Sequence, residues 1–221
     1  MSMPTSRRTH FLVTGLALLS GLFAAFTLHA RPGKKLTAQE RDARTFLDIV
    51  TGTLQPPQTV ANQAAWTAST DVTPEHTAAR TGAEKALAAV SGSKLVIDKT
   101  KAFLAQKGEL EPVTVRQLEK LLLDAAESPA TIPEVVAKRI EVEGRQSAIL
   151  DGYTFCLQSG AGGACVRPTS ANDIDDILRK SRNLKEREAV WIASKEIGRK
   201  LRPGLVELQA LRNKVAREMG Y

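Results

Sequence analysis

The chain of 221 residues carries three histidines, His10, His29 and His76. A helical zinc site of the hydrolytic type needs two histidines four residues apart, with a glutamate between them that deprotonates the metal-bound water. No two of these histidines have that spacing, and His76 has no second ligand in register. We therefore expect no zinc ligand, no cofactor and no catalytic residue within this chain. We interpret His76 as a solvent-facing residue of an amphipathic helix.

The two cysteines, Cys156 and Cys165, enclose a glycine-rich segment that can bend freely. Two thiols without a nearby histidine fall short of the four ligands that structural zinc requires. In an exported protein, both thiols would meet an environment in which disulfides persist. The spacing therefore favours a local disulfide between Cys156 and Cys165 over the alternative, a metal site.

Clustered carboxylates offer a third kind of chemistry. Asp173, Asp175 and Asp176 follow a serine that can begin a helix, and Glu141 and Glu143 lie within another helical segment. Acids near a helix start stabilise the helix dipole, and acids mixed with bases are typical of a solvated helix face. Since no nucleophile or convergent base accompanies them, an enzyme that uses carboxylates alone is not favoured.

Residues 1–30 have the pattern of a secretory signal peptide. Arg7 and Arg8 precede an uncharged apolar stretch over 11–26, and Ala30 offers a small residue for cleavage. The stretch is shorter than the roughly 20 residues that a membrane span needs, so we expect cleavage and no stable membrane anchor. Either the general secretory or the twin-arginine route would deliver the protein to the periplasm or the medium.

The mature chain, residues 31–221, is long enough for one domain with a real core. Removing the signal takes away two arginines and no acid, so the net charge falls from +7 to +5. Acids and bases alternate along the sequence, as they do on solvated helix faces. This mild and evenly spread excess of positive charge predicts no nucleic-acid partner.

Helix-favouring residues dominate the sequence, and aromatic residues make up only 5% of it. These features predict an all-α fold, a multi-helix array interrupted by one short disulfide-closed loop. A seven-residue apolar repeat in the last helix indicates core packing, with a coiled-coil partner as the alternative. We expect helices over 38–54, 57–68, 74–106, 113–127, 133–149, from 170 onward, and over 184–219.

The expected interruptions come from prolines and glycines. Pro56-Pro57 should end the first helix, and Pro203 should kink or split the last one, because a proline ring clashes with the carbonyl four residues earlier. Ser91-Gly92-Ser93 is a weak point in the helix over 74–106, and Gly108 is the expected left-handed cap after it. Residues 153–169 should be irregular.

Two segments are more specific than helical periodicity. The first places Ala65-Trp66 shortly before Thr70-Asp71-Val72-Thr73, where Thr73 is expected to cap the helix that begins at Pro74. The second leads from the disulfide loop, through an acidic helix and a tryptophan-containing helix, to Arg212-Asn213 and a final Gly220-Tyr221.

These segments resemble the angiotensin-converting-enzyme family of zinc peptidyl-dipeptidases, and the ending is best matched in bacterial members. The similarity runs over about 38–221, which corresponds to the first third of a family catalytic domain. It implies helices around a deep cleft closed by an N-terminal lid, zinc held by a His-Glu-x-x-His helix and a later glutamate, and release of dipeptides from peptide C-termini. The family features that carry over are the disulfide Cys156–Cys165 and the capping motif of Trp66, Thr70, Asp71 and Thr73. The loop after Cys165 contains no acid that could contact a substrate.

The predicted function is therefore the lid-bearing N-terminal part of an exported zinc-dependent peptidyl-dipeptidase, cut short before its metal-binding helix and inactive alone. Zinc and peptide substrates are expected only for a full-length relative. The exposed inner face of the lid should favour association with the missing C-terminal part or with a second copy. The alternative is a non-enzymatic exported helical module that binds peptide or protein partners in a groove.

Overall fold

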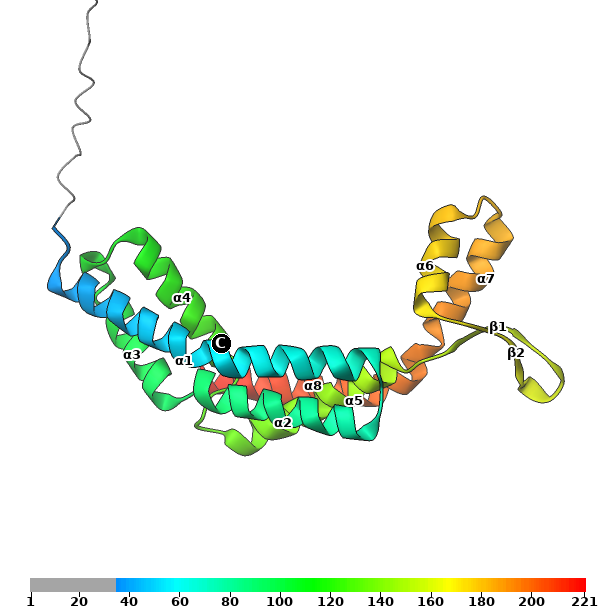
Figure 1. The fold of residues 1–221 in the computed structure, drawn as a ribbon, viewed down its shortest axis with the longest axis horizontal. Coiled ribbons are helices and arrows are strands. Elements are labelled where there is room, and N and C mark those ends of the chain that lie inside the picture. Colours follow the sequence, from blue (N-terminus) through cyan, green and yellow to red (C-terminus); the bar gives the residue numbers. More distant parts are fainter. Residues whose placement is uncertain (1–34) are drawn as a thin grey trace, which may run out of the picture. The chain divides into compact units, whose positions relative to one another are not determined.

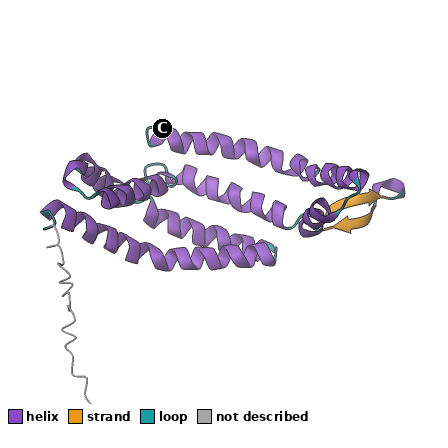
Figure 2. Ribbon diagram, turned by 90° about the horizontal axis from the view of Figure 1, so that it is seen from above, coloured by secondary structure: helices purple, strands orange, loops and turns teal. Residues whose placement is uncertain are grey.

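Helices make up nearly all of the chain that the structure describes (Figures 1 and 2). The computed structural model describes residues 35–221, and the predicted signal peptide, residues 1–30, lies outside this range. The elements are α1 (Ala38–Thr70), α2 (Pro74–Ser91), α3 (Lys94–Ala105), α4 (Pro112–Ala126), α5 (Pro133–Asp151), β1 (Phe155–Ser159), β2 (Cys165–Thr169), α6 (Ala171–Lys180), α7 (Leu184–Lys195) and α8 (Ile197–Glu218). The all-α expectation is confirmed, with one small hairpin added. In the described range, no helix is long and apolar enough to cross a bilayer.

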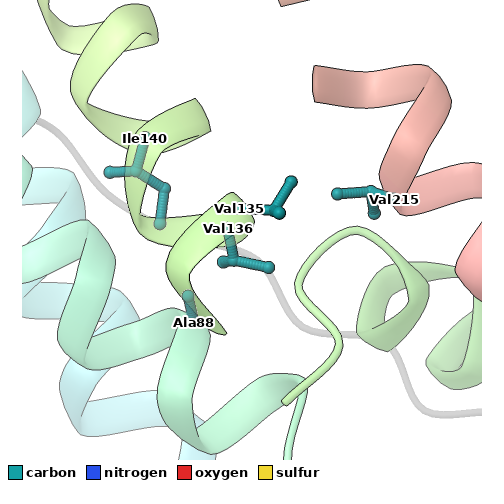
Figure 3. Close-up of a cluster of buried hydrophobic side chains, with 5 residues drawn as sticks. All are labelled: Ala88, Val135, Val136, Ile140 and Val215. Atoms are coloured by element: carbon teal, nitrogen blue, oxygen red, sulfur yellow. The ribbon is translucent and has the colours of Figure 1, made fainter. Parts of the chain in front are cut away.

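One core cluster joins α2, α5 and α8. Its buried members are Ala88, Val135, Val136, Ile140 and Val215. Figure 3 shows Val135 directed toward Val215, whereas Val136 lies close to Ala88. The helix α5 therefore packs on α2 through one side and on α8 through another. Each fully buried valine or isoleucine contributes roughly 1.5–3 kcal/mol relative to an exposed one.

A second core lies among α1, α3 and α4. It consists of two clusters, Val50, Val96, Ile97 and Ala125 in one, and Ala43, Leu110 and Leu118 in the other. Phe46 packs against both clusters, and its ring centroid lies 5.5 Å from that of Phe103. The N-terminal half of α1 is therefore held by α3 and α4 together.

Two glycines allow unusually close approaches between elements. A Cβ atom at Gly92 would lie 1.6 Å from the carbonyl oxygen of Ser128, in the connection between α4 and α5. A Cβ atom at Gly204 of α8 would lie 2.0 Å from Nε2 of Gln146 in α5. A side chain at Gly92 would have to displace the backbone between α4 and α5, whereas one at Gly204 would have to displace the Gln146 side chain, so close backbone packing depends on glycine at Gly92.

The two strands, α6, α7 and the start of α8 form a separate group over residues 153–202, which we call the hairpin module. Phe155, Ile174, Val190 and Ile197 make up its own buried cluster. The strands pair antiparallel, from Phe155 opposite Thr169 to Ser159 opposite Cys165. The remaining described helices and α8 from residue 203 onward are called the helical body below.

The predicted break at Pro56-Pro57 is wrong, because α1 continues through both prolines as one helix. The prolines leave the carbonyls of Gly52 and Thr53 without their usual N–H donors. Both residues are exposed, so solvent can hydrate those carbonyls. The buried Ala61 and Ala68 continue the packed side of α1 beyond the prolines, and this tertiary packing outweighs the local cost.

The helix expected over 74–106 is divided at its weak point, into α2 and α3, with Ser93 as the N-cap of α3. The expected left-handed cap at Gly108 is wrong, because the positive φ angles of the described glycines lie at 162, 163 and 220. The helix α3 ends at Ala105, and a short 3₁₀ turn follows. Leu110 is buried against Leu118, and this contact draws the chain out of the helix early.

The expectation of irregular structure over 153–169 is also wrong, since this segment contains the β1–β2 hairpin. Gly162 and Gly163, at φ angles of 72° and 82°, supply the left-handed backbone that reverses the chain. The predicted split at Pro203 is misplaced. The chain breaks at Glu196, between α7 and α8, and the exposed Pro203 lies inside α8, away from the packed side at Leu208.

Candidate functional site

An open groove of about 980 Å³ lies between the N-terminal half of α1 and α4. We call it the α1–α4 groove. Its apolar lining comprises the buried or half-buried Leu47, Val50, Leu54 and Leu121 together with the exposed Val113, and its exposed charged rims carry Arg44, Asp48, Arg116, Lys120 and Asp124. A peptide segment could place apolar side chains on this lining and polar groups at the rims.

Glu40 ties α1 to the start of α4, and its side chain is only 1% exposed. One carboxylate oxygen accepts hydrogen bonds from Thr114 Oγ1 at 2.6 Å and from Arg44 Nε at 2.5 Å, and the other accepts from the N–H of Glu111 at 2.9 Å. Burial raises the pKa of Glu40, but these donors outweigh it, and the net pKa lies below the ordinary value. The buried Glu40 carboxylate thus holds Arg44 and Thr114, two residues that line the groove.

Sequence reasoning missed Glu40 as a tertiary residue. The pattern Thr37-x-x-Glu40 is that of a capping box, and Thr37 Oγ1 does accept a hydrogen bond from the N–H of Glu40 at 2.9 Å. The Glu40 carboxylate, however, bonds to Thr114, seventy-four residues later. The local motif could have suggested a helix start at Thr37 but could not have identified this distant donor.

A second polar network joins α5 to α8. Glu143 accepts hydrogen bonds from Arg139 Nη1 at 2.7 Å and from Arg212 Nη2 at 2.8 Å, and Arg139 Nη2 donates to Ser128 Oγ at 3.1 Å. Arg139 and Glu143 also line a cleft of about 480 Å³ together with Glu84 of α2. The Nε of Arg139 is buried and has no acceptor in the described chain. This network holds helices together and presents no nucleophile.

The predicted disulfide is confirmed, since Cys156 and Cys165 are bonded and their Cα atoms lie 5.7 Å apart. The two cysteines lie on β1 and β2 and close the hairpin around its glycine loop. The segment after Cys165 forms the strand β2, which is exposed up to Pro168 and becomes buried at Thr169.

The remaining predicted residues gather between α1 and α2. Trp66 is 73% exposed, and its carbonyl accepts a hydrogen bond from Thr70 Oγ1 at 2.9 Å. Asp71 is the C-cap of α1, and Thr73 is the N-cap of α2, with its hydroxyl accepting from the N–H of His76 at 3.1 Å. The side chain of His76 was predicted to face solvent, but it is half-buried. Its Nδ1 lies 2.8 Å from the Asp71 carbonyl oxygen, which can only accept, so Nδ1 carries the proton.

In the described chain, four of the five clustered acids, all but Asp175, form side-chain hydrogen bonds or ion pairs, and Glu143 does so in the network between α5 and α8. Glu141 pairs with Lys85 at 2.6 Å, and Asp173 completes a capping box with Ser170 at the start of α6. Asp176 pairs with Lys180 at 2.6 Å and also with Arg179. Hydrogen bonds from Lys85 and Lys180 lower the pKa values of Glu141 and Asp176. Across residues 35–221, no group of three or more His, Cys, Asp or Glu side chains could hold a metal ion.

Over residues 35–221 the chain is a helical array with capped helices and a disulfide-closed hairpin, and it brings together no group of side chains that could hold a metal ion. A family model described as angiotensin-converting enzyme matches residues 37–221, which is most of the chain. The chain belongs to the angiotensin-converting enzyme family. A comparison with curated proteins gave no match.

Proposed function

We propose that residues 31–221 form the lid-bearing N-terminal part of an exported zinc-dependent peptidyl-dipeptidase, and that residues 1–30 are a cleaved signal peptide. The family match over 37–221 is the observation that carries this proposal. The corresponding full-length enzyme would release dipeptides from peptide C-termini in the periplasm or the medium. This chain would supply a structural part of that enzyme.

The same proposal makes the chain inactive by itself. The sequence contains no His-Glu-x-x-His, and its one histidine beyond residue 30 is His76, whose Nδ1 proton is directed at a carbonyl. A single imidazole cannot replace the two helical histidines and the glutamate that bind zinc and activate water. Zinc and catalysis would have to come from residues that this sequence does not contain.

Exposed apolar side chains on α1 and α3 support a partner for these N-terminal helices. Ile49, Trp66 and Leu95 are each more than half exposed. Scattered apolar residues are common on monomers, but bulky ones at this exposure become favourable contacts when another surface covers them. We propose that the partner is the remaining part of such an enzyme or, when that part is absent, a second copy of the chain.

An activity assay tests the proposal. The purified chain, given zinc and an N-acylated tripeptide, should release no dipeptide above the rate of a zinc-only control. Zinc-dependent release that a chelator abolishes would overturn the proposal.

A second test reads the codons that follow Tyr221. A His-Glu-x-x-His motif there, in frame or after a frameshift, would support an interrupted peptidase, and unrelated sequence would contradict it.

The α1–α4 groove favours a second candidate, an exported helical module that binds peptides without cleaving them. Its apolar lining and charged rims are those of a peptide-binding surface. Fluorescence anisotropy with labelled peptides would test this function, and Arg116→Glu on the rim should then weaken binding. Lys101→Glu on α3, outside the groove lining, is the matched control. Binding that both variants leave unchanged would exclude the groove.

A further inference from the structure

The solvent-facing side of α7 and the start of α8 carries three bulky apolar side chains followed by three basic ones. Its members follow one another at spacings of seven, one, three, four and three residues along the helices. We call this surface the outer α7–α8 face. It comprises Leu184, Trp191, Ile192, Lys195, Arg199 and Arg202.

These residues lie on one side of α7 and α8 because the opposite side packs into the hairpin module. Val190, Ile197 and Leu201 all contribute to the cluster of the hairpin module. The break at Glu196 keeps helical φ and ψ angles of −62° and −30°, so the packed and exposed sides continue across the junction. Residues about half a turn away from the packed ones therefore face outward on both helices.

The apolar members of the face are exposed to solvent to an unusual degree. Leu184 is 76% exposed, Trp191 is 55% exposed and Ile192 is 52% exposed. The Lys195 ammonium lies 5.0 Å from the centroid of the Trp191 ring, which brings a cation and an aromatic ring together at the surface. Long basic side chains beside an exposed tryptophan are the combination that suits a membrane–water interface.

Charge is divided unevenly between the two regions of the chain. Residues 153–202 carry ten basic and six acidic side chains, whereas the rest of 35–221 carries seventeen and eighteen. Two exposed acids, Glu188 and Glu196, lie on α7 or at its junction with α8 beside this face, and Glu196 is paired with Arg199 at 3.4 Å. The positive excess of the described chain is thus concentrated in the module that presents Trp191.

We propose that the outer α7–α8 face docks reversibly on anionic lipid bilayers. Trp191, Ile192 and Leu184 enter the headgroup region, while Lys195, Arg199 and Arg202 contact lipid phosphates. Charge complementarity selects an anionic surface, and the separate bulky apolar side chains favour a bilayer over an acidic protein, which would offer fixed polar groups to them. This docking is peripheral, and it does not depend on the proposed peptidase function.

The two tryptophans of the chain provide site-specific reporters. Trp66→Phe leaves Trp191 as the fluorophore on the proposed face, and Trp191→Phe leaves the exposed Trp66 on α1 as the matched control. The full chain is mixed with vesicles of phosphatidylcholine, with or without phosphatidylglycerol. With phosphatidylglycerol, Trp191 emission should shift to the blue and become protected from acrylamide, and Trp66 should change little. An unchanged Trp191 signal overturns the proposal.

A charge-matched comparison tests the basic side chains. Lys195→Gln, Arg199→Gln and Arg202→Gln together should weaken vesicle binding by about fivefold for each cation removed. The control removes three exposed lysines of the helical body, Lys99, Lys101 and Lys107, by the same substitution. Equal loss in both triple variants overturns the proposal, because any cation would then serve. Binding to soluble poly-glutamate without binding to vesicles would also overturn the proposal, since the face would then recognise an acidic polypeptide.

Discussion

The helical body and the hairpin module are stabilised in different ways. In the body, Phe46 packs against both clusters of α1, α3 and α4, and Gly92 lets its backbone approach that of Ser128 closely. In the module, one cluster and the Cys156–Cys165 bond hold two strands and short helices. The body should therefore lose stability as a whole when one contact is removed, whereas the module should open on its own.

The largest effect is expected at the closest backbone approach in the body. Gly92→Ala would place a methyl group 1.6 Å from the Ser128 carbonyl oxygen, so we expect a loss of about 4 kcal/mol in the free energy of unfolding, or failure to fold. Urea denaturation followed by circular dichroism measures this loss. Gly82→Ala in α2 meets no atom within 4 Å and should raise stability by up to about 1 kcal/mol. Similar effects of the two variants would disprove the close approach.

Substitutions that create a cavity should have different effects in the two regions. Leu118→Ala, in the body, should cost about 3 kcal/mol, and Val190→Ala, in the module, about 2 kcal/mol. Hydrogen exchange read by mass spectrometry should show faster exchange throughout the body in the first variant. In the second, faster exchange should be confined to residues 153–202. Acceleration in α2 and α5 by Val190→Ala would mean that the two regions unfold as one unit.

The disulfide should matter only to the module. Replacing Cys156 and Cys165 by serine should destabilise the module by about 2.5 kcal/mol, because the cross-link restricts the unfolded chain. Exchange should accelerate in α6 and α7 and stay unchanged in α1. Mild reduction of the unmodified protein is the control and should give the same pattern. A loss of protection in α1 would contradict the separation of the two regions.

The smallest effect is expected at Glu40, and it depends on pH. Its folded pKa is lowered, so the unfolded chain binds the proton at higher pH. The stabilisation is complete above the ordinary glutamate pKa of about 4.3 and is lost as the pH falls through the folded pKa. At neutral pH, Glu40→Gln should cost about 1.5 kcal/mol, and the difference should vanish in acid. The exposed Glu119→Gln is the control. A difference that persists at low pH would show that the charge is not responsible.

Sequence patterns predicted those elements whose determinants are local. Thr73, followed by Pro74, does begin a helix, and Ser170 with Asp173 forms the expected capping box. Such signals can be recognised without tertiary information, because their side-chain hydrogen bonds span only three residues. The disulfide could also be predicted from local sequence, because a flexible glycine segment separates the two cysteines.

The failures have distant causes. Pro56 and Pro203 looked like breaks, yet both lie on exposed sides of helices whose opposite sides are packed. The hairpin was missed because glycines dominate the segment between its strands and hide the short alternation around Phe155. For the candidate site, the apolar lining of the α1–α4 groove was unpredictable, because it requires α1 and α4 to be placed by Glu40 and Thr114.

We propose that this member of the angiotensin-converting enzyme family contributes helices and, within residues 35–221, no metal site. Equilibrium dialysis of the purified chain against buffered zinc, followed by elemental analysis, tests it most directly. We predict far less than one zinc per chain and no change when His76→Gln is introduced. One tightly held zinc per chain, lost in His76→Gln, would contradict the account.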